Sequence, residues 1–255
     1  MKTIALANQK GGVGKTTTTI NLGAYLSEQG QRVLIVDIDP QGNAGSGLGL
    51  SISTIEKNIY HWLIEDGIEA PIVKTKYPRL DIVPANIDLS GFEVDMRDAE
   101  NRDHILKSRL DSIKDQYDFA LIDCPPSLGI LTINAMTAAN SVLIPLQCEY
   151  FALEGLTQLL RIIRLVQSKL NQQLEIEGVL MTMFDSRTRL AGQVVQDVRE
   201  HFKKQVYDVI IPRNVKLSEA PSYGQPISMY DPSSTGAIAY KSLAKDLLAR
   251  QVKSV

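Results

Sequence analysis

One stretch decides the fold of this 255-residue chain: Asn8-Gln9-Lys10-Gly11-Gly12-Val13-Gly14-Lys15-Thr16-Thr17. It follows a short apolar run at residues 3–7 and precedes a helical pattern at residues 16–29, which is the context that a phosphate-binding loop requires. Glycines let backbone N–H groups converge on phosphate oxygens, and the N-terminus of the following helix adds a favourable dipole. The stretch therefore predicts a phosphate site in which Lys15 reaches the β and γ phosphates and Thr16 places its hydroxyl on Mg²⁺.

Short β-branched runs alternate with longer helical patterns along the rest of the chain, which is typical of a doubly wound α/β fold: one mostly parallel sheet with helices on both faces. Strands are expected at residues 3–7, 32–37, 80–84, 119–123, 141–146, 177–183 and 206–211. Helices are expected at residues 16–29, 152–169 and 235–250. A glycine-rich segment at residues 42–55 is expected to be a mobile loop beside the nucleotide. Because no long linker divides the chain, residues 1–255 are interpreted as a single P-loop NTPase domain.

Composition is that of an ordinary globular protein, with 44% apolar and 22% charged residues. The formal charge of -2 argues against a protein that binds nucleic acid over its whole surface, although a local basic face is compatible with it. Cys124 and Cys148 are expected to be small core residues in a reducing compartment. No secretory signal and no run of apolar residues long enough for a membrane span is found, so a cytoplasmic location is expected.

Acidic residues end two of the predicted strands. Asp37 and Asp39 follow residues 33–36, and Asp123 follows residues 119–122. Open α/β sheets bind ligands at the carboxyl ends of their strands. Asp123 is therefore expected to hold Mg²⁺ as a Walker B acid, and Asp37 to support the ion or its waters.

The phosphate loop departs from the strict Walker A pattern, because Gln9 stands where that pattern has a glycine. Lys10 followed by Gly11-Gly12 resembles the deviant Walker A motif of the ParA/MinD family of dimeric ATPases. The resemblance implies that ATP makes the chain dimerise and that Lys10 reaches the partner's phosphates, doing the work of an arginine finger beside the catalytic Lys15. The loop residues assigned to the nucleotide are Lys10, Gly11, Gly12, Val13, Gly14, Lys15, Thr16 and Thr17.

The resemblance implies further site residues. Asp39 matches the family's switch aspartate, which orients and helps to deprotonate the attacking water; with Thr16 and Asp123 it completes the expected Mg²⁺ set. Residues 125–129 resemble the second switch.

Two weaker matches concern the nucleotide. Glu149 is expected to contact nucleotide across the dimer, and Pro212 and Asn214 to lie in the loop that holds adenine. An ordinary strand-end acid and an ordinary proline turn are the alternatives.

Residues 185–216 carry seven basic and four acidic residues. Within this segment Arg187 and Lys216 resemble the basic residues that Soj-type members use for sequence-independent DNA binding. Few aromatic residues lie between these charges, which favours duplex over single-stranded DNA. A scattered solvated surface is the alternative.

The resemblance extends over nearly the whole chain, including residues 215–222 and 230–236, and favours a Soj-type ParA without the N-terminal helix-turn-helix domain of long plasmid ParA proteins. It implies a slow ATPase of DNA partition. The ATP-bound homodimer would bind duplex DNA on the nucleoid non-specifically, and a ParB-like centromere-binding protein would stimulate its hydrolysis and release.

Three other classes fit the sequence less well. A MinD-like positioning ATPase would insert a C-terminal amphipathic helix into a membrane, but residues 242–255 offer Leu243, Leu247, Leu248 and Val252 without Phe or Trp, so a packing helix and no membrane partner are expected. The cysteines do not match the cluster ligands of a nitrogenase-type iron protein. The polar set of a substrate pocket, as in a dethiobiotin synthetase, is not recognised, nor is any histidine-based metal spacing.

Overall fold

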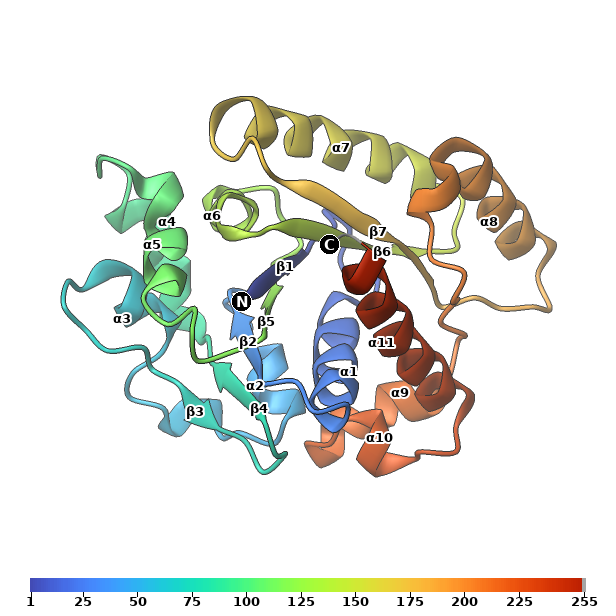
Figure 1. Cartoon of the computed structure of the whole chain (residues 1–255), viewed down its shortest axis with the longest axis horizontal. Coiled ribbons are helices and arrows are strands. Elements are labelled where there is room, and N and C mark those ends of the chain that lie inside the picture. The colour runs from blue at the N-terminus through green and yellow to red at the C-terminus, as the bar shows by residue number, and fades with distance from the viewer. Residues whose placement is uncertain (254–255) are drawn as a thin grey trace.

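A computed structural model describes residues 1–253, and within them the chain forms one seven-stranded sheet with helices on both faces (Figure 1). The strand order is β3-β4-β2-β5-β1-β6-β7, and every neighbouring pair is parallel except β3 with β4. The strands are β1 Lys2–Leu6, β2 Val33–Asp37, β3 Val73–Lys74, β4 Leu80–Val83, β5 Phe119–Asp123, β6 Ser141–Gln147 and β7 Glu175–Thr182. The predicted α/β fold with a mostly parallel sheet is confirmed.

Helices α1, α2, α9, α10 and α11 cover one face of the sheet, and α3 to α8 contribute to the other (Figure 1). Their bounds are α1 Lys15–Glu28, α2 Asn43–Gly47, α3 Ile59–Ile64, α4 Phe92–Asp95, α5 Ile105–Asp111, α6 Ile130–Ala138, α7 Ala152–Lys169, α8 Arg189–Phe202, α9 Val215–Glu219, α10 Ile227–Tyr230 and α11 Thr235–Lys253. Short 3₁₀ turns occupy Ile52–Thr54, Ile87–Gly91, Arg102–His104, Lys203–Gln205 and Ala220–Tyr223.

The two faces of the sheet bury separate hydrophobic clusters. Along β2, Leu34 and Val36 point into one cluster while Val33 and Ile35 point into the other, because successive side chains of a strand alternate between faces. All four are fully buried, and burying an aliphatic side chain of this size stabilises the fold by about 1.5–3 kcal/mol. Burial on both faces explains why the central strands are almost continuously apolar.

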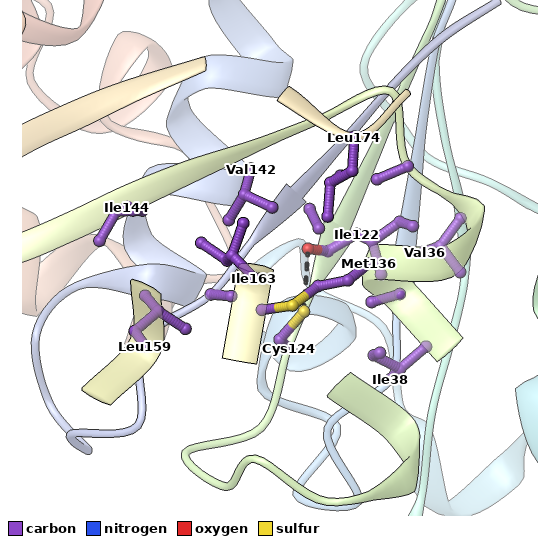
Figure 2. Packing of buried hydrophobic residues seen from close by; sticks show 14 of the residues in the cluster. Val36, Ile38, Ile122, Cys124, Met136, Val142, Ile144, Leu159, Ile163 and Leu174 are labelled. Atoms are coloured by element: carbon purple, nitrogen blue, oxygen red, sulfur yellow. Dashed lines mark hydrogen bonds between the residues drawn. The ribbon is translucent and has the colours of Figure 1, made fainter. Parts of the chain in front are cut away.

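Both cysteines are free thiols in the core, as predicted. Figure 2 shows Cys124 packed with Met136 among the aliphatic residues of the larger cluster, where its thiol faces the carbonyl oxygen of Ile122 at 3.9 Å. Burial raises the pKa of both Cys124 and Cys148, so both remain protonated packing residues.

The strand expected at residues 206–211 is wrong. Only two isolated bridges link this region to β7 and its end, Val179 with Val206 and Phe184 with Pro212. The amides of Tyr207 and Ile211 donate to the carbonyls of Val179 and Met181, both at 2.9 Å. Four residues therefore advance along this segment against two along β7, so the segment bulges away between these bonds and no regular ladder forms.

The mobile loop expected at residues 42–55 is also wrong, because part of this segment is the short helix α2 followed by the 3₁₀ turn Ile52–Thr54. Its glycines allow close packing. A Cβ on Gly45 would lie 2.4 Å from Ile52 Cδ1, and one on Gly47 would lie 2.6 Å from Ile20 Cδ1. The glycines that suggested a loop therefore allow α1, α2 and the 3₁₀ turn to pack closely together.

The C-terminal helix α11 packs on α1. Leu243 and Leu247 are fully buried and Leu248 is partly buried, as expected of a packing helix. Residues 254–255 and the side chain of Val252 lie outside the described part of the chain. Over residues 1–253, no helix combines the length and apolar character needed to cross a membrane.

Candidate nucleotide site and basic surface

The phosphate loop joins β1 to α1 with two residues in the left-handed region, Gly12 at φ 72° and Gly14 at φ 90°. A side chain at either position would be strained, which explains glycine there. Gly14 caps the 14-residue helix α1, and the carbonyl of Gly14 accepts the amide of Thr18 at 2.9 Å. Residues 10–17 therefore have the geometry of an anion-binding loop at a helix N-terminus.

Lys15 is buried at the start of α1, and its ammonium donates to the carbonyl of Lys10 at 3.2 Å. Burial lowers the pKa of Lys15, and the nearby Asp123, Cys124 and Asp39 oppose that change. An ammonium held inside the loop is in position for the phosphates of a nucleotide.

Asp123 ends β5 and is completely buried. Its Oδ1 accepts the hydroxyl of Thr19 at 3.1 Å, while its Oδ2 has no hydrogen-bond partner in the described structure. Burial raises the pKa of Asp123 to about 7, although the nearby hydroxyls of Thr16 and Thr19 oppose the rise. A buried oxygen without a partner is what a Mg²⁺ ion or a water bound to it would satisfy, so Thr16 and Asp123 fit that role.

The two acids at the end of β2 have different surroundings. Asp37 is completely buried, and its two oxygens accept the amides of Asp39 at 3.0 Å and of Ala44 at 3.1 Å. Burial, together with the nearby Asp123, raises the pKa of Asp37 well above its usual range. Asp37 thus holds the start of α2 and the turn that carries Asp39.

Asp39 lies close enough to Asp123 and Lys15 to raise the pKa of both side chains. Its Oδ1 accepts the amide of Gln41 at 3.0 Å, which is the bond of a turn aspartate. No group of three or more His, Cys, Asp or Glu side chains in residues 1–253 could hold a metal ion. An ion at Thr16, Asp39 and Asp123 would need phosphate and water oxygens as well, as Mg²⁺ at a nucleotide usually does.

A pocket of about 350 Å³ opens beside the loop and includes both predicted adenine-loop residues, Pro212 and Asn214. The side chain of Asn214 is committed within the chain: it caps α9 through the amide of Lys216 at 2.8 Å and donates to Thr235 at 2.8 Å. Asn214 therefore borders the pocket and also caps α9.

The pocket wall also includes Gly14 and Thr17 of the phosphate loop, both of which were predicted to bind the nucleotide. The remaining wall residues were not predicted as site residues: Thr182, Met183, Ile211, Arg213, Leu217, Ser218, Pro221 and Tyr240. Tyr240 of α11 is bonded to Thr18 of α1 at 3.0 Å, and Thr182 of β7 donates to the carbonyl of Val13 at 2.8 Å. These contacts join residues more than a hundred positions apart, so no local sequence signal could have identified them.

Lys10 forms an ion pair with Glu149 of the same chain, and Glu149 also accepts a hydrogen bond from Gln147. Lys10 and Glu149 were each expected to make a contact across a dimer, whereas in the structure they contact each other within one chain. Both side chains are close to half exposed.

The two cations expected to bind DNA are exposed, and each is paired with an acid of its own chain. Arg187 donates to both oxygens of Asp185, at 2.9 and 2.7 Å. Lys216 donates to Glu219 at 2.9 Å. The bond from Arg187 holds the pKa of Asp185 well below its usual range.

Backbone bonds between Phe184 and residues 211 and 213 hold the two cation-bearing segments side by side. Arg213 adds an exposed cation near Asp185. The surface therefore carries both signs of charge, and an anion that binds Arg187 or Lys216 competes with a carboxylate for the cation.

Comparisons with known proteins agree with this architecture. The AAA domain family model AAA_31 matches residues 1–176. The chain is 55% identical over 249 residues to the sporulation initiation inhibitor protein Soj of Bacillus subtilis, covering 97% of this chain and 98% of Soj. It is 51% identical over 257 residues to the chromosome partitioning protein ParA of Caulobacter vibrioides, covering 98% and 95%.

Among solved structures, the chain is similar to a protein from Mycobacterium smegmatis described as cobyrinic acid a,c-diamide synthase with bound ATP analogue and magnesium. The TM-score is 0.87 at 40% identity, and the match covers 97% of this chain and 94% of the other.

Proposed function

Because this chain belongs to the Soj/ParA family of chromosome-partitioning ATPases, we propose that it uses ATP to switch a DNA-bound dimer on and off. The chain is an ATPase that uses ATP and Mg²⁺. The proposal adds a sandwich homodimer, non-specific binding to duplex DNA of the nucleoid, and stimulation of slow hydrolysis by a ParB-like partner. We treat residues 1–255 as a single ATPase domain in this scheme.

The phosphates are proposed to bind residues 10–17, where Lys15 would exchange the carbonyl of Lys10 for phosphate oxygens. Thr16 and Asp123 would hold the magnesium ion with help from Asp39, and the bound ion would neutralise charge on the β and γ phosphates. Asp39 would also orient the attacking water. The base would occupy the 350 Å³ pocket at Pro212 and Asn214.

Lys10 is proposed to act on the partner's nucleotide. A fixed cation beside transferring phosphates stabilises the charge that spreads over their oxygens in the transition state. An exposed lysine on the outer edge of the loop supports this role, because it has room to meet a second chain. Glu149 would lie at the same interface.

The observation that carries the DNA part of the proposal is the position of α9. Leu217 and Ser218 line the nucleotide pocket, and the preceding residue, Lys216, is exposed on the same short helix. A change in pocket occupancy would therefore move a proposed DNA contact directly. A dimer would present two copies of Arg187 and Lys216, which strengthens a weak electrostatic site.

The proposal is tested by DNA binding across a salt series, with ATP and with ADP, for wild type and for an Arg187→Ala/Lys216→Ala double variant. The wild type should bind only with ATP. If both residues of both chains contact phosphates, the double variant should lower the slope of log affinity against log salt by about 3 to 4. A Lys107→Ala/Lys114→Ala variant, altered at exposed lysines around α5, should bind as wild type does.

Removing the paired acids should have the opposite effect. An Asp185→Asn/Glu219→Gln variant frees both cations and should bind DNA more tightly than wild type. If wild-type protein that dimerises with ATP binds no DNA, the DNA part of the proposal is wrong and lipid vesicles become the next ligand to test.

The biosynthetic name of the M. smegmatis protein points to a second candidate activity, amide synthesis on a corrin ring. Partition is preferred because Soj and ParA are more similar to this chain, at 55% and 51% identity.

A further inference from the structure

Lys10 is held by its own chain at the position from which it would have to reach a partner. Its ammonium is paired with Glu149, which lies just beyond the end of β6. The second oxygen of that carboxylate accepts the side-chain amide of Gln147, the last residue of β6. Glu149 is therefore oriented by the sheet, and it fixes the direction of the lysine that it holds.

The backbone around Lys10 is anchored to the same strand. The amide of Lys10 donates to Asn8 Oδ1 at 3.0 Å, and Asn8 Nδ2 donates to the carbonyl of Pro145 in β6 at 2.8 Å. The carbonyl of Lys10 accepts Lys15 Nζ at 3.2 Å. The amide, carbonyl and ammonium of Lys10 are thus all engaged within the chain, and both lysines of the loop are occupied by protein oxygens.

The ion pair lies at the surface, with 44% of the Lys10 side chain and 47% of the Glu149 side chain exposed. Exposed pairs of this kind shift an equilibrium by only about twofold to fivefold. A nucleotide carries several negative charges on its phosphates, so it can displace a single carboxylate from the ammonium. The pair is therefore weak enough to open and strong enough to bias where Lys10 points.

We propose that Glu149 is a positioning residue that keeps Lys10 on its own chain until the phosphates of a partner's nucleotide replace its carboxylate. The inference rests on the dimer of the proposed function and describes how that dimer is restrained. An ammonium that bridged Glu149 and the partner's phosphates would hold these anions close together, and their mutual repulsion favours release of the carboxylate. Because each chain of the dimer carries one such pair, two pairs must open, and this raises the ATP concentration at which dimers form.

The pair itself is tested on nucleotide-free protein by measuring the acylation rate of each lysine with an amine-reactive ester and mass spectrometry. Glu149→Ala should make Lys10 react about threefold faster, because the side chain no longer has to leave a carboxylate before its amine can attack the ester. Glu28→Ala, which removes an exposed acid at the end of α1, about 20 Å along the helix from Lys15, is the control and should leave Lys10 unchanged. Equal rates in Glu149→Ala and wild type overturn the inference.

The consequence is tested by measuring dimerisation by light scattering as ATP is increased. Glu149→Ala should dimerise at lower ATP than wild type, with the dimerisation constant raised about tenfold because two pairs no longer have to open. Glu28→Ala should match wild type. An unchanged or higher ATP requirement in Glu149→Ala overturns the inference; a higher one would instead support a direct contact between Glu149 and the partner's nucleotide.

The two measurements separate this inference from the proposed function. Unchanged Lys10 acylation in Glu149→Ala, with ATP still causing wild type to dimerise, rejects the positioning role alone. A wild type that remains monomeric with ATP rejects the dimer, and with it the exchange of Lys10 between anions.

Discussion

Asp37 and Asp123 occupy paired positions at the carboxyl ends of β2 and β5, and both side chains are completely buried. Burial raises the pKa of each, and each also lies within electrostatic reach of Asp39. Acids gathered in a buried place destabilise the ionised protein unless a cation joins them. This arrangement of buried acids therefore serves the function of the site and lowers the stability of the nucleotide-free fold.

The first prediction concerns pH and stability. An unfolded aspartate has a pKa of about 3.9, whereas folding raises that of Asp123 to about 7. Between these values the native chain holds a proton that the unfolded chain has lost, so this residue's contribution to the free energy of unfolding falls as pH rises, by up to about 1.4 kcal/mol per pH unit.

Urea unfolding of nucleotide-free wild type and Asp123→Asn, between about pH 5 and 7, measures this contribution as the difference between the two proteins. Asp123→Asn should lose less stability with rising pH than wild type does. Parallel stability curves would mean that Asp123 does not hold a proton in the native state.

The second prediction concerns Lys10. Lys10→Ala should still bind ATP, because Lys15 and the loop amides remain, but its hydrolysis should fall about 10³-fold, the lower end of the effect of an arginine finger. Nucleotide binding by fluorescence and phosphate release measure the two effects. Lys114→Ala removes an exposed lysine far from the loop in sequence and should leave both values unchanged. Normal turnover in Lys10→Ala would reject the proposed catalytic role.

The third prediction concerns Asp39. Asp39→Ala should bind ATP, fail to hydrolyse it and remain as a dimer on DNA, since no carboxylate orients the water. Asp39→Asn keeps an oxygen for the amide of Gln41 and so preserves the turn, yet it should be equally inactive. Phosphate release and dissociation from DNA test both variants. If Asp39→Asn hydrolyses ATP as wild type does, Asp39 is a structural turn residue.

The fourth prediction concerns Gly224, which has a φ of 61° and lies against Gly49. A Cβ there would lie 2.5 Å from the Cα of Gly49, so Gly224→Ala must displace backbone and should destabilise by about 2–4 kcal/mol. Gly67 has a φ of 74°, but a Cβ added to it would meet nothing within 4 Å, so Gly67→Ala should cost only about 1 kcal/mol. Urea unfolding compares the two, and equal losses would contradict the close approach of Gly224 and Gly49.

Features with a local cause could be predicted from the sequence alone. Residues 8–17 indicate a phosphate loop because glycine conformation, strand end and helix start are all properties of adjacent residues. Six of the seven predicted strands are present in the structure, because a continuous apolar run of residues is enough to indicate a buried parallel strand. The prediction for residues 206–211 failed because apolar character shows burial but not hydrogen-bond register, which depends on β7.

Which side chains meet depends on the folded arrangement of the whole chain. Tyr240 with Thr18 and Lys10 with Glu149 are separated by more than a hundred residues, and the order of strands brings them together. The charge pairs differ from these contacts: the carboxylates that hold Arg187 and Lys216 lie only two and three residues away, so local backbone structure is enough to bring each pair together. A linear pattern specifies the chemical groups that a chain possesses, whereas their distances, and therefore their energies, exist only after the chain has folded.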